Sequence, residues 1–509
     1  MPTETLNKYL TWLQAEAPNA QLSSDSREIG SGDVFFAYPG YAGDGRSYIG
    51  NAIEGGAKAV VYEADGFAWN DAWKVPHMAV QDLKKLAGPL ANAYYSRPDA
   101  AMFTVAVTGT NGKTSCSQWL GKALSRLGQP TAVIGTLGIG LYQRGTPGGF
   151  SNTGYTTPDA VLLQRNLARL RDAGATALAI EASSIGLEQG RLNGLHVDAA
   201  LFTNFTRDHL DYHGDMAAYE DAKRILFDWP GLQHAVINFD DGMGLRLIEH
   251  LTKTNPQLNV IGYTVSDTAV PNVKSLRASE IRTSHGGTTF RLDSLFGSAQ
   301  IKTQLVGQFN VSNVLGIVGV LLAKGVAFKA ACEAAETLTA VPGRMQQLGG
   351  QEAPLVVIDY AHTPDALEKT LATLRQVAQQ RNGTLWCVFG CGGDRDPGKR
   401  PQMGRVAQAA DHIIVTSDNP RSEDPAKILE QIVEGIDTAR LAKDAPQVIE
   451  DRAAAILWAV RHAGKNDVVL LAGKGHEPYQ EIKGKKMPFL DADHAALALA
   501  SRATMKGTH

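Results

Sequence analysis

A glycine-rich segment at residues 108–115 combines the residue types that hold a nucleotide phosphate. It reads TGTNGKTS, and Lys113 and Thr114 directly follow its second glycine. Backbone N–H groups of such a loop can surround phosphate oxygens, a lysine adds positive charge, and a threonine hydroxyl can bind Mg²⁺. Only two residues separate Gly109 from the Gly-Lys pair, so the standard phosphate-loop spacing is not met. The segment predicts an ATP site of the variant form GxxGK[TS].

The residues around this loop predict a strand before it and a helix after it. Residues 104–107 are apolar or β-branched, as in a parallel strand that is buried on both faces, and residues 116–128 are compatible with a helix. This order places the loop at a helix N-terminus, where the helix dipole favours anions. The alternative is a glycine-rich turn with a chance lysine, and the flanking elements argue against it.

Apolar runs alternate with helix-like segments through most of the 509 residues, which predicts an α/β protein of several domains. We expect a small N-terminal α/β domain at 1–98, a central domain with a P-loop ATPase-like, mostly parallel sheet at 99–340, and a Rossmann-like C-terminal domain at 341–509. In the last domain, polar residues directly follow four apolar runs. Their loops should therefore meet in one site at the carboxyl ends of the strands.

Composition excludes several classes of protein. The 49 Lys and Arg residues against 52 Asp and Glu residues give a formal net charge of -3, which favours neither nucleic acid nor anionic lipid. The first residues lack a secretory pattern, and no apolar run is long enough to span a membrane. The cysteines show no disulfide framework and no paired zinc spacing, so we expect them to be reduced and buried in a cytoplasmic protein. They are Cys116, Cys332, Cys387 and Cys391.

Three further segments carry a family resemblance: EASS at 181–184, TNFTRDHLDYHG at 203–214 and YEDAK at 219–223. With GTNGKTS they resemble the Mur ligase and folylpolyglutamate synthetase superfamily, and in particular the Mur ligases that add diaminopimelate or lysine. The resemblance covers about residues 22–477, with its motifs in family order. It implies a cytoplasmic enzyme of peptidoglycan precursor synthesis that uses ATP to join a carboxylate to an amine.

The resemblance also implies the catalytic and metal-binding residues. Glu181 ends one apolar run and His209 follows another, so both can face the phosphate loop. A carbamate formed from CO₂ would make Lys223 an anion that can hold a metal. The alternatives are a core or capping role for His209 and a solvated helix face for Lys223. The implied catalytic residues are Lys113, His209, Lys223 and Arg344, and the implied Mg²⁺ ligands are Thr114, Glu181, His209 and carbamylated Lys223.

Two binding sets follow from the same resemblance. ATP would be bound by Gly109, Thr110, Asn111, Gly112, Lys113, Thr114, Asn310, Asn313, Arg344 and Asp359. UDP-N-acetylmuramoyl-L-alanyl-D-glutamate would be held by Ser24, Ser26, Tyr41, Ala42, Gly43, Thr156, Thr157, Ser183, Gln189 and Arg191. A helix-capping role is the alternative for the two asparagines. Ile185 stands where the family pattern has histidine, so one substrate contact of the family should differ here.

The sequence Asp-Asn-Pro-Arg at 418–421 favours meso-diaminopimelate as the incoming amino acid, because relatives that add lysine usually lack this arginine. Diaminopimelate is lysine with a second carboxylate at its far end, which a guanidinium can bind with two hydrogen bonds. Lysine would leave the arginine charge unpaired, and a helix-capping surface arginine is the other alternative. The implied diaminopimelate set is Arg395, Asp418, Asn419, Pro420, Arg421, Gly473 and Glu477.

The sequence therefore predicts a monomeric ligase that joins diaminopimelate to the UDP-linked dipeptide, with closure near residue 341 bringing the substrates together. The length leaves no room for a fused second ligase. Three alternatives stay open: a lysine-adding ligase, a folylpolyglutamate synthetase and a nucleotide-binding regulator without catalytic activity. The loops of the N-terminal domain argue against the folate enzyme. The presence of Lys113, Glu181, His209 and Lys223 argues against the regulator.

Overall fold

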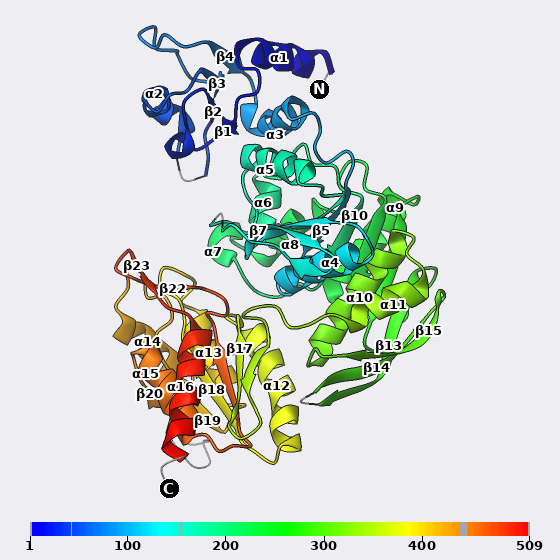
Figure 1. Cartoon of the computed structure of the whole chain (residues 1–509), viewed down its shortest axis with the longest axis vertical. Coiled ribbons are helices and arrows are strands. Elements are labelled where there is room, and N and C mark those ends of the chain that lie inside the picture. The colour runs from blue at the N-terminus through cyan, green and yellow to red at the C-terminus, as the bar shows by residue number, and fades with distance from the viewer. Residues whose placement is uncertain (1–2, 42, 153, 285, 438–444, 507–509) are drawn as a thin grey trace.

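The computed structural model describes residues 3–41, 43–152, 154–284, 286–437 and 445–506. Three α/β units follow one another along the chain, with the middle unit between the other two (Figure 1). The predicted fold class is confirmed: a small N-terminal domain, a central domain with a parallel-dominated sheet and a Rossmann-like C-terminal domain. The boundaries at 98 and 340 stay predictions.

The N-terminal unit is a parallel sheet in the order β1-β2-β3-β4. Its strand β3 corresponds to the apolar run KAVVY, and α3 packs on α5 of the middle unit. Between the two units, Arg165 pairs with Glu28 at 2.8 Å. The elements are α1 (Thr3–Glu16), β1 (Leu22–Ser23), η1 (Ser26–Glu28), β2 (Val34–Ala37), η2 (Gly45–Tyr48), α2 (Ile49–Glu54), β3 (Ala59–Glu63), β4 (His77–Val80) and α3 (Leu83–Tyr94).

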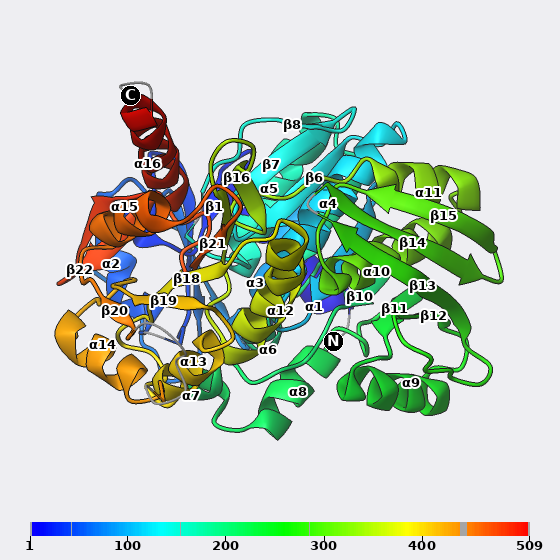
Figure 2. The same cartoon turned by 90° about the horizontal axis from the view of Figure 1, so that it is seen from below.

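The middle unit contains an 11-stranded sheet in the order β15-β14-β13-β12-β11-β10-β5-β9-β6-β7-β8. The strands from β13 to β6 pair in parallel, whereas β14 and β15 at one edge and β7 and β8 at the other pair antiparallel (Figure 2). Its strands are β5 (Phe103–Thr108), β6 (Thr131–Gly135), β7 (Gly138–Gln143), β8 (Thr146–Pro147), β9 (Ala177–Glu181), β10 (Ala199–Phe202), β11 (His234–Asn238), β12 (Asn259–Thr264), β13 (Lys274–Ser284), β14 (Gly287–Ser294) and β15 (Gly297–Thr303).

Helices cover both faces of this sheet because its central strands are apolar on both sides. Val105 and Val107 of β5 pack with α4 and α10, while Ala106 between them packs with the cluster that includes α5 and α9. The helices are α4 (Lys113–Arg126), α5 (Ala160–Asp172), α6 (Ser184–Glu188), α7 (Leu210–His213), α8 (Met216–Arg224), α9 (Gly242–Thr254), α10 (Gln308–Ala323) and α11 (Phe328–Glu336).

The C-terminal unit has a six-stranded sheet in the order β16-β17-β21-β18-β19-β20, with only β16 antiparallel, and a separate hairpin of β22 and β23. All four strands predicted here are present: the predicted segments at 353–361, 384–393, 411–420 and 466–475 contain β17, β18, β19 and β21. The elements are β16 (Gln346–Gly349), β17 (Leu355–Asp359), α12 (Pro364–Gln380), β18 (Leu385–Phe389), α13 (Lys399–Ala407), β19 (His412–Val415), α14 (Pro425–Val433), β20 (Gln447–Val448), α15 (Arg452–His462), β21 (Val468–Ala472), β22 (Tyr479–Ile482), β23 (Lys485–Pro488) and α16 (Asp491–Lys506).

The four cysteines are free and buried, as predicted. In the described part of the chain, no helix has both the length and the apolar character that crossing a bilayer requires.

Candidate functional site

The glycine loop joins β5 to α4 and is held from the side by the end of β10. Thr110 N donates to Asn204 O at 2.8 Å, and Asn111 N donates to the Asn204 side chain at 2.9 Å. Thr203 Oγ1 donates to Asn111 O at 2.6 Å. Sequence reasoning did not assign Thr203 and Asn204 to the site. The available signal was that they end an apolar run, because the strand before them lies beside β5.

Gly109 is required where the loop leaves β5. Its φ is +146°, and a Cβ atom there would lie 1.9 Å from Thr203 Oγ1. Lys113 Nζ donates to Gly109 O at 2.7 Å and to Thr110 O at 2.9 Å, which keeps the ammonium inside the loop. Burial lowers the pKa of Lys113, and the nearby carboxylates of Glu181 and Asp208 oppose this shift. The loop thus presents backbone N–H groups and a lysine together at the start of a long helix.

Thr114 connects the phosphate loop to Glu181 at the end of β9 and to Arg344 at the start of the C-terminal unit. Its Oγ1 donates to Glu181 Oε2 at 3.1 Å and accepts from Arg344 Nη2 at 3.1 Å. Thr136 also donates to Glu181, through its hydroxyl at 3.0 Å and its backbone N at 2.9 Å. The Arg344 guanidinium stacks over Tyr360, with its Cζ 4.3 Å from the ring centre. Among the described residues, the buried Nε of Arg344 has no hydrogen-bond partner. An unpaired donor beside the phosphate loop suits an anionic ligand.

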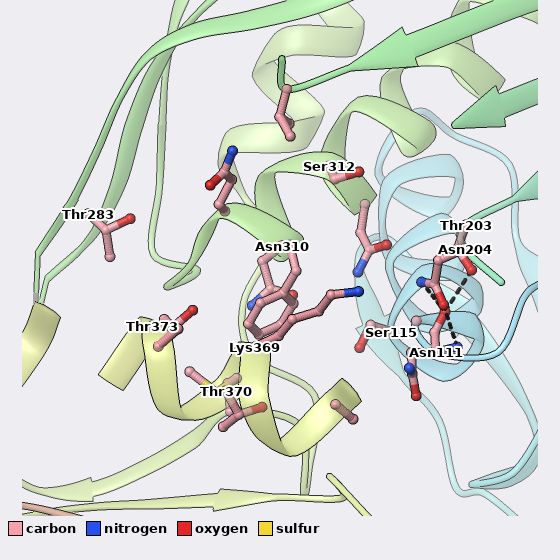
Figure 3. A pocket seen from close by; sticks show the side chains of 18 of the residues that line it. Asn111, Ser115, Thr203, Asn204, Thr283, Asn310, Ser312, Lys369, Thr370 and Thr373 are labelled. Carbon is pink, nitrogen blue, oxygen red and sulfur yellow. Dashed lines mark hydrogen bonds between the residues drawn. The ribbon is translucent and has the colours of Figure 1, made fainter. Parts of the chain in front are cut away.

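A cavity of about 770 Å³ opens beside the loop, between the middle and C-terminal units, and this volume suits a nucleotide. Figure 3 shows Asn111 hydrogen-bonded to Thr203 and Asn204 on one side, with Asn310, Lys369 and Thr373 on the other. Of the predicted ATP residues, the cavity is lined by Asn111, Gly112, Asn310, Asn313, Arg344 and Asp359. Lys369 and Thr373 of α12 were not predicted.

The two asparagines do not cap α10, whose N-cap is Gly307. Asn310 Nδ2 donates to Val306 O at 2.9 Å, and Asn313 packs so closely on Gly112 that a Cβ there would lie 2.9 Å from Asn313 Oδ1. Asp359 accepts hydrogen bonds from Met345 N at 2.8 Å and Ala361 N at 2.9 Å. Burial raises the pKa of Asp359, and Arg344 opposes the shift. Asp359 therefore holds the backbone that carries Arg344.

The predicted metal ligands come from four different helices and strands: Thr114 from α4, Glu181 from β9, His209 from the N-cap of α7 and Lys223 from α8. Glu181 bonds Thr114, whereas His209 lies 3.5 Å from Asp208, and burial lowers the pKa of His209 to about 4. Lys223 is 1% exposed, with its ammonium 4.4 Å from the Tyr219 ring centre. Burial, reinforced by the charge of Lys113, holds the pKa of Lys223 well below its ordinary value. Among the described residues, no three His, Cys, Asp or Glu side chains converge on a metal site.

A second cavity, of about 750 Å³, is lined by residues of all three units. Tyr41 of the first unit and Thr156 and Ile185 of the second line it. The predicted loops of the C-terminal unit also meet here, which confirms their convergence. The lining residues from that unit include Tyr360, His362, Gly390, Gly392, Arg395, Asp418, Asn419, Arg421, Gly473 and Glu477.

Hydrogen bonds join most of the residues predicted for the dipeptide end. Arg191 donates to Thr157 O at 2.9 Å and to Gln189 Oε1 at 2.8 Å, and Gln189 Nε2 donates to Tyr212 OH at 3.0 Å. The Tyr212 ring lies 5.0 Å from that of Tyr41, and the hydroxyls of Thr157 and Ser183 are 2.9 Å apart. The network therefore reaches the N-terminal unit.

The remaining residues predicted for the UDP end are placed elsewhere or not described. Ser24 Oγ donates to Asp159 Oδ1 at 2.9 Å, at the N-cap of α5. Ser26 begins η1, and Gly43 O accepts from Gly40 N at 2.8 Å. Ala42 lies outside the described residues.

The predicted diaminopimelate residues form a compact group at the ends of β18, β19 and β21. Arg421 Nη1 donates to Gly393 O at 2.7 Å, and its Nε lies 3.6 Å from Glu481 of the hairpin. Asn419 Nδ2 donates to Glu477 Oε2 at 2.8 Å. Burial raises the pKa of Glu477, with a further contribution from Asp418. The group offers guanidinium and carboxylate side by side, as recognition of an amino acid zwitterion requires.

Fold and site together define an ATP-dependent ligase class, and the comparisons agree with this class. The chain belongs to the Mur ligase family: family models match at 20–95 (Mur ligase family, catalytic domain), 107–321 (Mur ligase middle domain) and 343–475 (Mur ligase, glutamate ligase domain).

Relatives named UDP-N-acetylmuramoyl-L-alanyl-D-glutamate--2,6-diaminopimelate ligase cover nearly the whole chain. The protein from Janthinobacterium sp. (strain Marseille) is 68% identical over 99% of this chain and 98% of its own. The protein from Ralstonia nicotianae is 52% identical over 97% of this chain and 96% of its own. A solved structure of the same name is 36% identical, covers 96% of this chain and 99% of its own, and superposes with a TM-score of 0.66.

The geometry of the loop predicts that Gly109→Ala abolishes ATP binding without unfolding the protein, since the added Cβ would displace Thr203. Gly128→Ala is the matched control: its φ is +87°, but nothing lies within 4 Å of the added Cβ. It should cost about 1 kcal/mol of stability and leave ATP binding intact. Calorimetric titration with ATP and thermal unfolding measure both effects. ATP binding by Gly109→Ala at wild-type affinity would contradict the expected displacement.

Proposed function

We propose that this protein is the ATP-dependent ligase that adds meso-2,6-diaminopimelate to UDP-N-acetylmuramoyl-L-alanyl-D-glutamate. The observation that carries the proposal is the 750 Å³ cavity, which brings Tyr41 and Thr156 together with Arg421 and Glu477 in one space. The hydrogen bond from Arg344 to Thr114 joins this region to the phosphate loop. Relatives up to 68% identical carry the name of this reaction.

The proposal assigns one substrate to each domain. Residues 1–98 hold the UDP end, residues 99–340 hold ATP, and residues 341–509 hold the incoming amino acid. The protein acts as a cytoplasmic monomer, and its buried, free cysteines suit a reducing compartment.

The reaction has two steps. The γ-carboxylate of D-glutamate attacks the γ-phosphate of ATP, giving an acyl phosphate and ADP. The amine of diaminopimelate then attacks the acyl carbon, and phosphate leaves as the amide forms. Carboxylate and triphosphate repel each other, so the charges of Lys113 and Arg344 are needed in the first step. Closure of the C-terminal domain brings the amine in and excludes water, which would otherwise hydrolyse the acyl phosphate.

The residues around Thr114 fit Mg²⁺. Mg²⁺ prefers oxygen ligands and is usually held by one or two carboxylates together with phosphates and waters. The hydroxyl of Thr114 and the carboxylate of Glu181 are such ligands and lie together at the loop. His209, held neutral by its low pKa, and carbamylated Lys223 complete the proposed set. The bound metal would offset negative charge on the phosphates.

Lys223 suits carbamate formation. Only a neutral amine attacks CO₂, and the low pKa of this buried amine supplies that form. The Lys223 amine lies 4.4 Å from the centre of the Tyr219 ring. The resulting negative charge would lie near Lys113, whose positive charge would stabilise it.

The proposed use of ATP predicts that Lys113→Ala reduces amide formation by at least about 100-fold, because the charge that opposes the repulsion between the reactants is lost. Product formation is measured with ATP, the UDP-linked dipeptide and diaminopimelate. Lys253→Ala, which removes an exposed lysine of the same domain, should behave as wild type. Undiminished synthesis by Lys113→Ala would refute the role of the loop, and a wild-type protein that forms no product would favour a regulator.

The proposed specificity predicts that Arg421→Ala raises the KM for diaminopimelate by on the order of a few hundred-fold, since the distal carboxylate loses its charged partner. Wild type should use diaminopimelate far better than lysine, and the variant should lose most of that preference. Arg405→Ala, an exposed arginine on α13, is the control. Faster turnover of lysine than of diaminopimelate by wild type would instead assign the lysine-adding activity.

The proposed carbamate predicts one carbamate carbon signal when the protein is equilibrated with ¹³C-bicarbonate and examined by NMR. The signal should vanish in Lys223→Ala and persist in Lys253→Ala. Addition of acid should remove it, because carbamates decompose when protonated. Identical spectra for Lys223→Ala and wild type would exclude a carbamate at this position.

A further inference from the structure

Lys474 lies at the centre of the diaminopimelate group, although neither the sequence resemblance nor the proposed function gives it a role. Its side chain is completely buried, and its ammonium donates to Asn419 Oδ1 at 3.1 Å and to Glu477 Oε2 at 3.1 Å. Asp418 Oδ1 lies 3.8 Å from the same nitrogen. A fully buried ammonium is costly unless it is paired, so these oxygens are its necessary partners.

The charges around Lys474 do not balance without a ligand. Asp418 and Glu477 bring two carboxylates to the group, and Lys474 brings one ammonium. Buried Arg452 has its own carboxylate partner, Asp491 at 2.6 Å, whereas Arg421 lies at the cavity, 3.6 Å from Glu481. Lys474, Asp418 and Glu477 together therefore carry one net negative charge, and both carboxylate residues line the 750 Å³ cavity.

Lys474 also joins two loops that come from different strands. Asn419 follows β19, while Lys474 and Glu477 follow β21, and Asn419 bridges to Glu477 through its Nδ2. Asn419 Oδ1 additionally accepts from Glu481 N of the hairpin at 2.9 Å. The Lys474 ammonium is thus placed where it can set the distance between the carboxylates of Asp418 and Glu477.

We propose that Lys474 is a positioning residue for the incoming diamino acid: it neutralises one of the two carboxylates and holds Asp418 and Glu477 so that together they bind a single ammonium. This inference rests on the proposed diaminopimelate site. The distal end of diaminopimelate carries one ammonium and one carboxylate. The ammonium pairs with the remaining negative charge, and the carboxylate pairs with Arg421.

The pKa of Glu477 agrees with this geometry. Burial and the neighbouring Asp418 raise this pKa, while Lys474 lowers it. Without Lys474 the two carboxylates would repel each other in a buried space, and one of them would take up a proton or turn away. Either change removes an acceptor from the substrate ammonium.

Four variants test the proposal: Lys474→Met, Glu477→Gln, the double variant, and Lys485→Met, which removes an exposed hairpin lysine as a control. KM for each of the three substrates, kcat and thermal unfolding are measured. Lys474→Met should raise the KM for diaminopimelate by on the order of 100-fold, while the KM values for ATP and the UDP-linked dipeptide stay within about twofold. Lys485→Met should match wild type.

The double variant separates positioning from a purely structural role. Removing Lys474 when residue 477 is already uncharged leaves only one buried carboxylate. The KM for diaminopimelate of the double variant should then be less than about threefold above that of Glu477→Gln. If Lys474→Met does not fold, the double variant should fold. The proposal would be overturned if Lys474→Met raised the KM for diaminopimelate equally in the wild type and in Glu477→Gln. It would also be overturned by a double variant that fails to fold, or by increases in all three KM values. Inactivity of wild type with diaminopimelate would instead refute the proposed function.

Discussion

The hydrogen bond between Arg344 and Thr114 links the two halves of the site. Thr114 belongs to the phosphate loop, and Arg344 belongs to the segment that enters the C-terminal domain. Tyr360, under the Arg344 guanidinium, lines both cavities, so the nucleotide space and the substrate space share this wall. Any closure of the C-terminal domain must therefore move the diaminopimelate group and the shared wall of the nucleotide cavity together. This coupling suits a reaction in which a reactive intermediate must meet its amine before it meets water.

Buried charge is the second organising constraint. Lys223 and Lys474 are buried and Lys113 is partly buried, and each of the three has different surroundings. Lys113 rests on loop carbonyls, Lys474 lies among side-chain oxygens, and Lys223 faces an aromatic ring with a strongly lowered pKa. The three environments suit three proposed roles: Lys113 binds phosphate, Lys474 positions two carboxylates, and Lys223, whose lowered pKa favours the neutral amine, can be modified.

Much of the fold could be predicted from the sequence because its parallel strands are buried on both faces and form continuous apolar runs. The strands β5, β9, β10, β17, β18, β19 and β21 all lie within predicted runs. The edge strands β13, β14 and β15 of the central sheet and the hairpin of β22 and β23 were not predicted. Their exposed or alternating residues resemble loops in a single sequence, and only pairing with neighbours makes them strands.

For the site, the sequence by itself determined the chemical groups: a glycine loop with Lys113 and Thr114, carboxylates after apolar runs, and an arginine that can read a second carboxylate. These follow from local order along the chain, since a loop between strand and helix has few conformations. Only the tertiary structure decided which groups meet. Arg344 reaches Thr114 across 230 residues, and Lys474 meets Asn419 across 55 residues, because the strands that carry them are brought together by the sheets and by domain packing. Burial, and with it the unusual pKa of Lys223, is likewise a property of the assembled core that no local pattern contains.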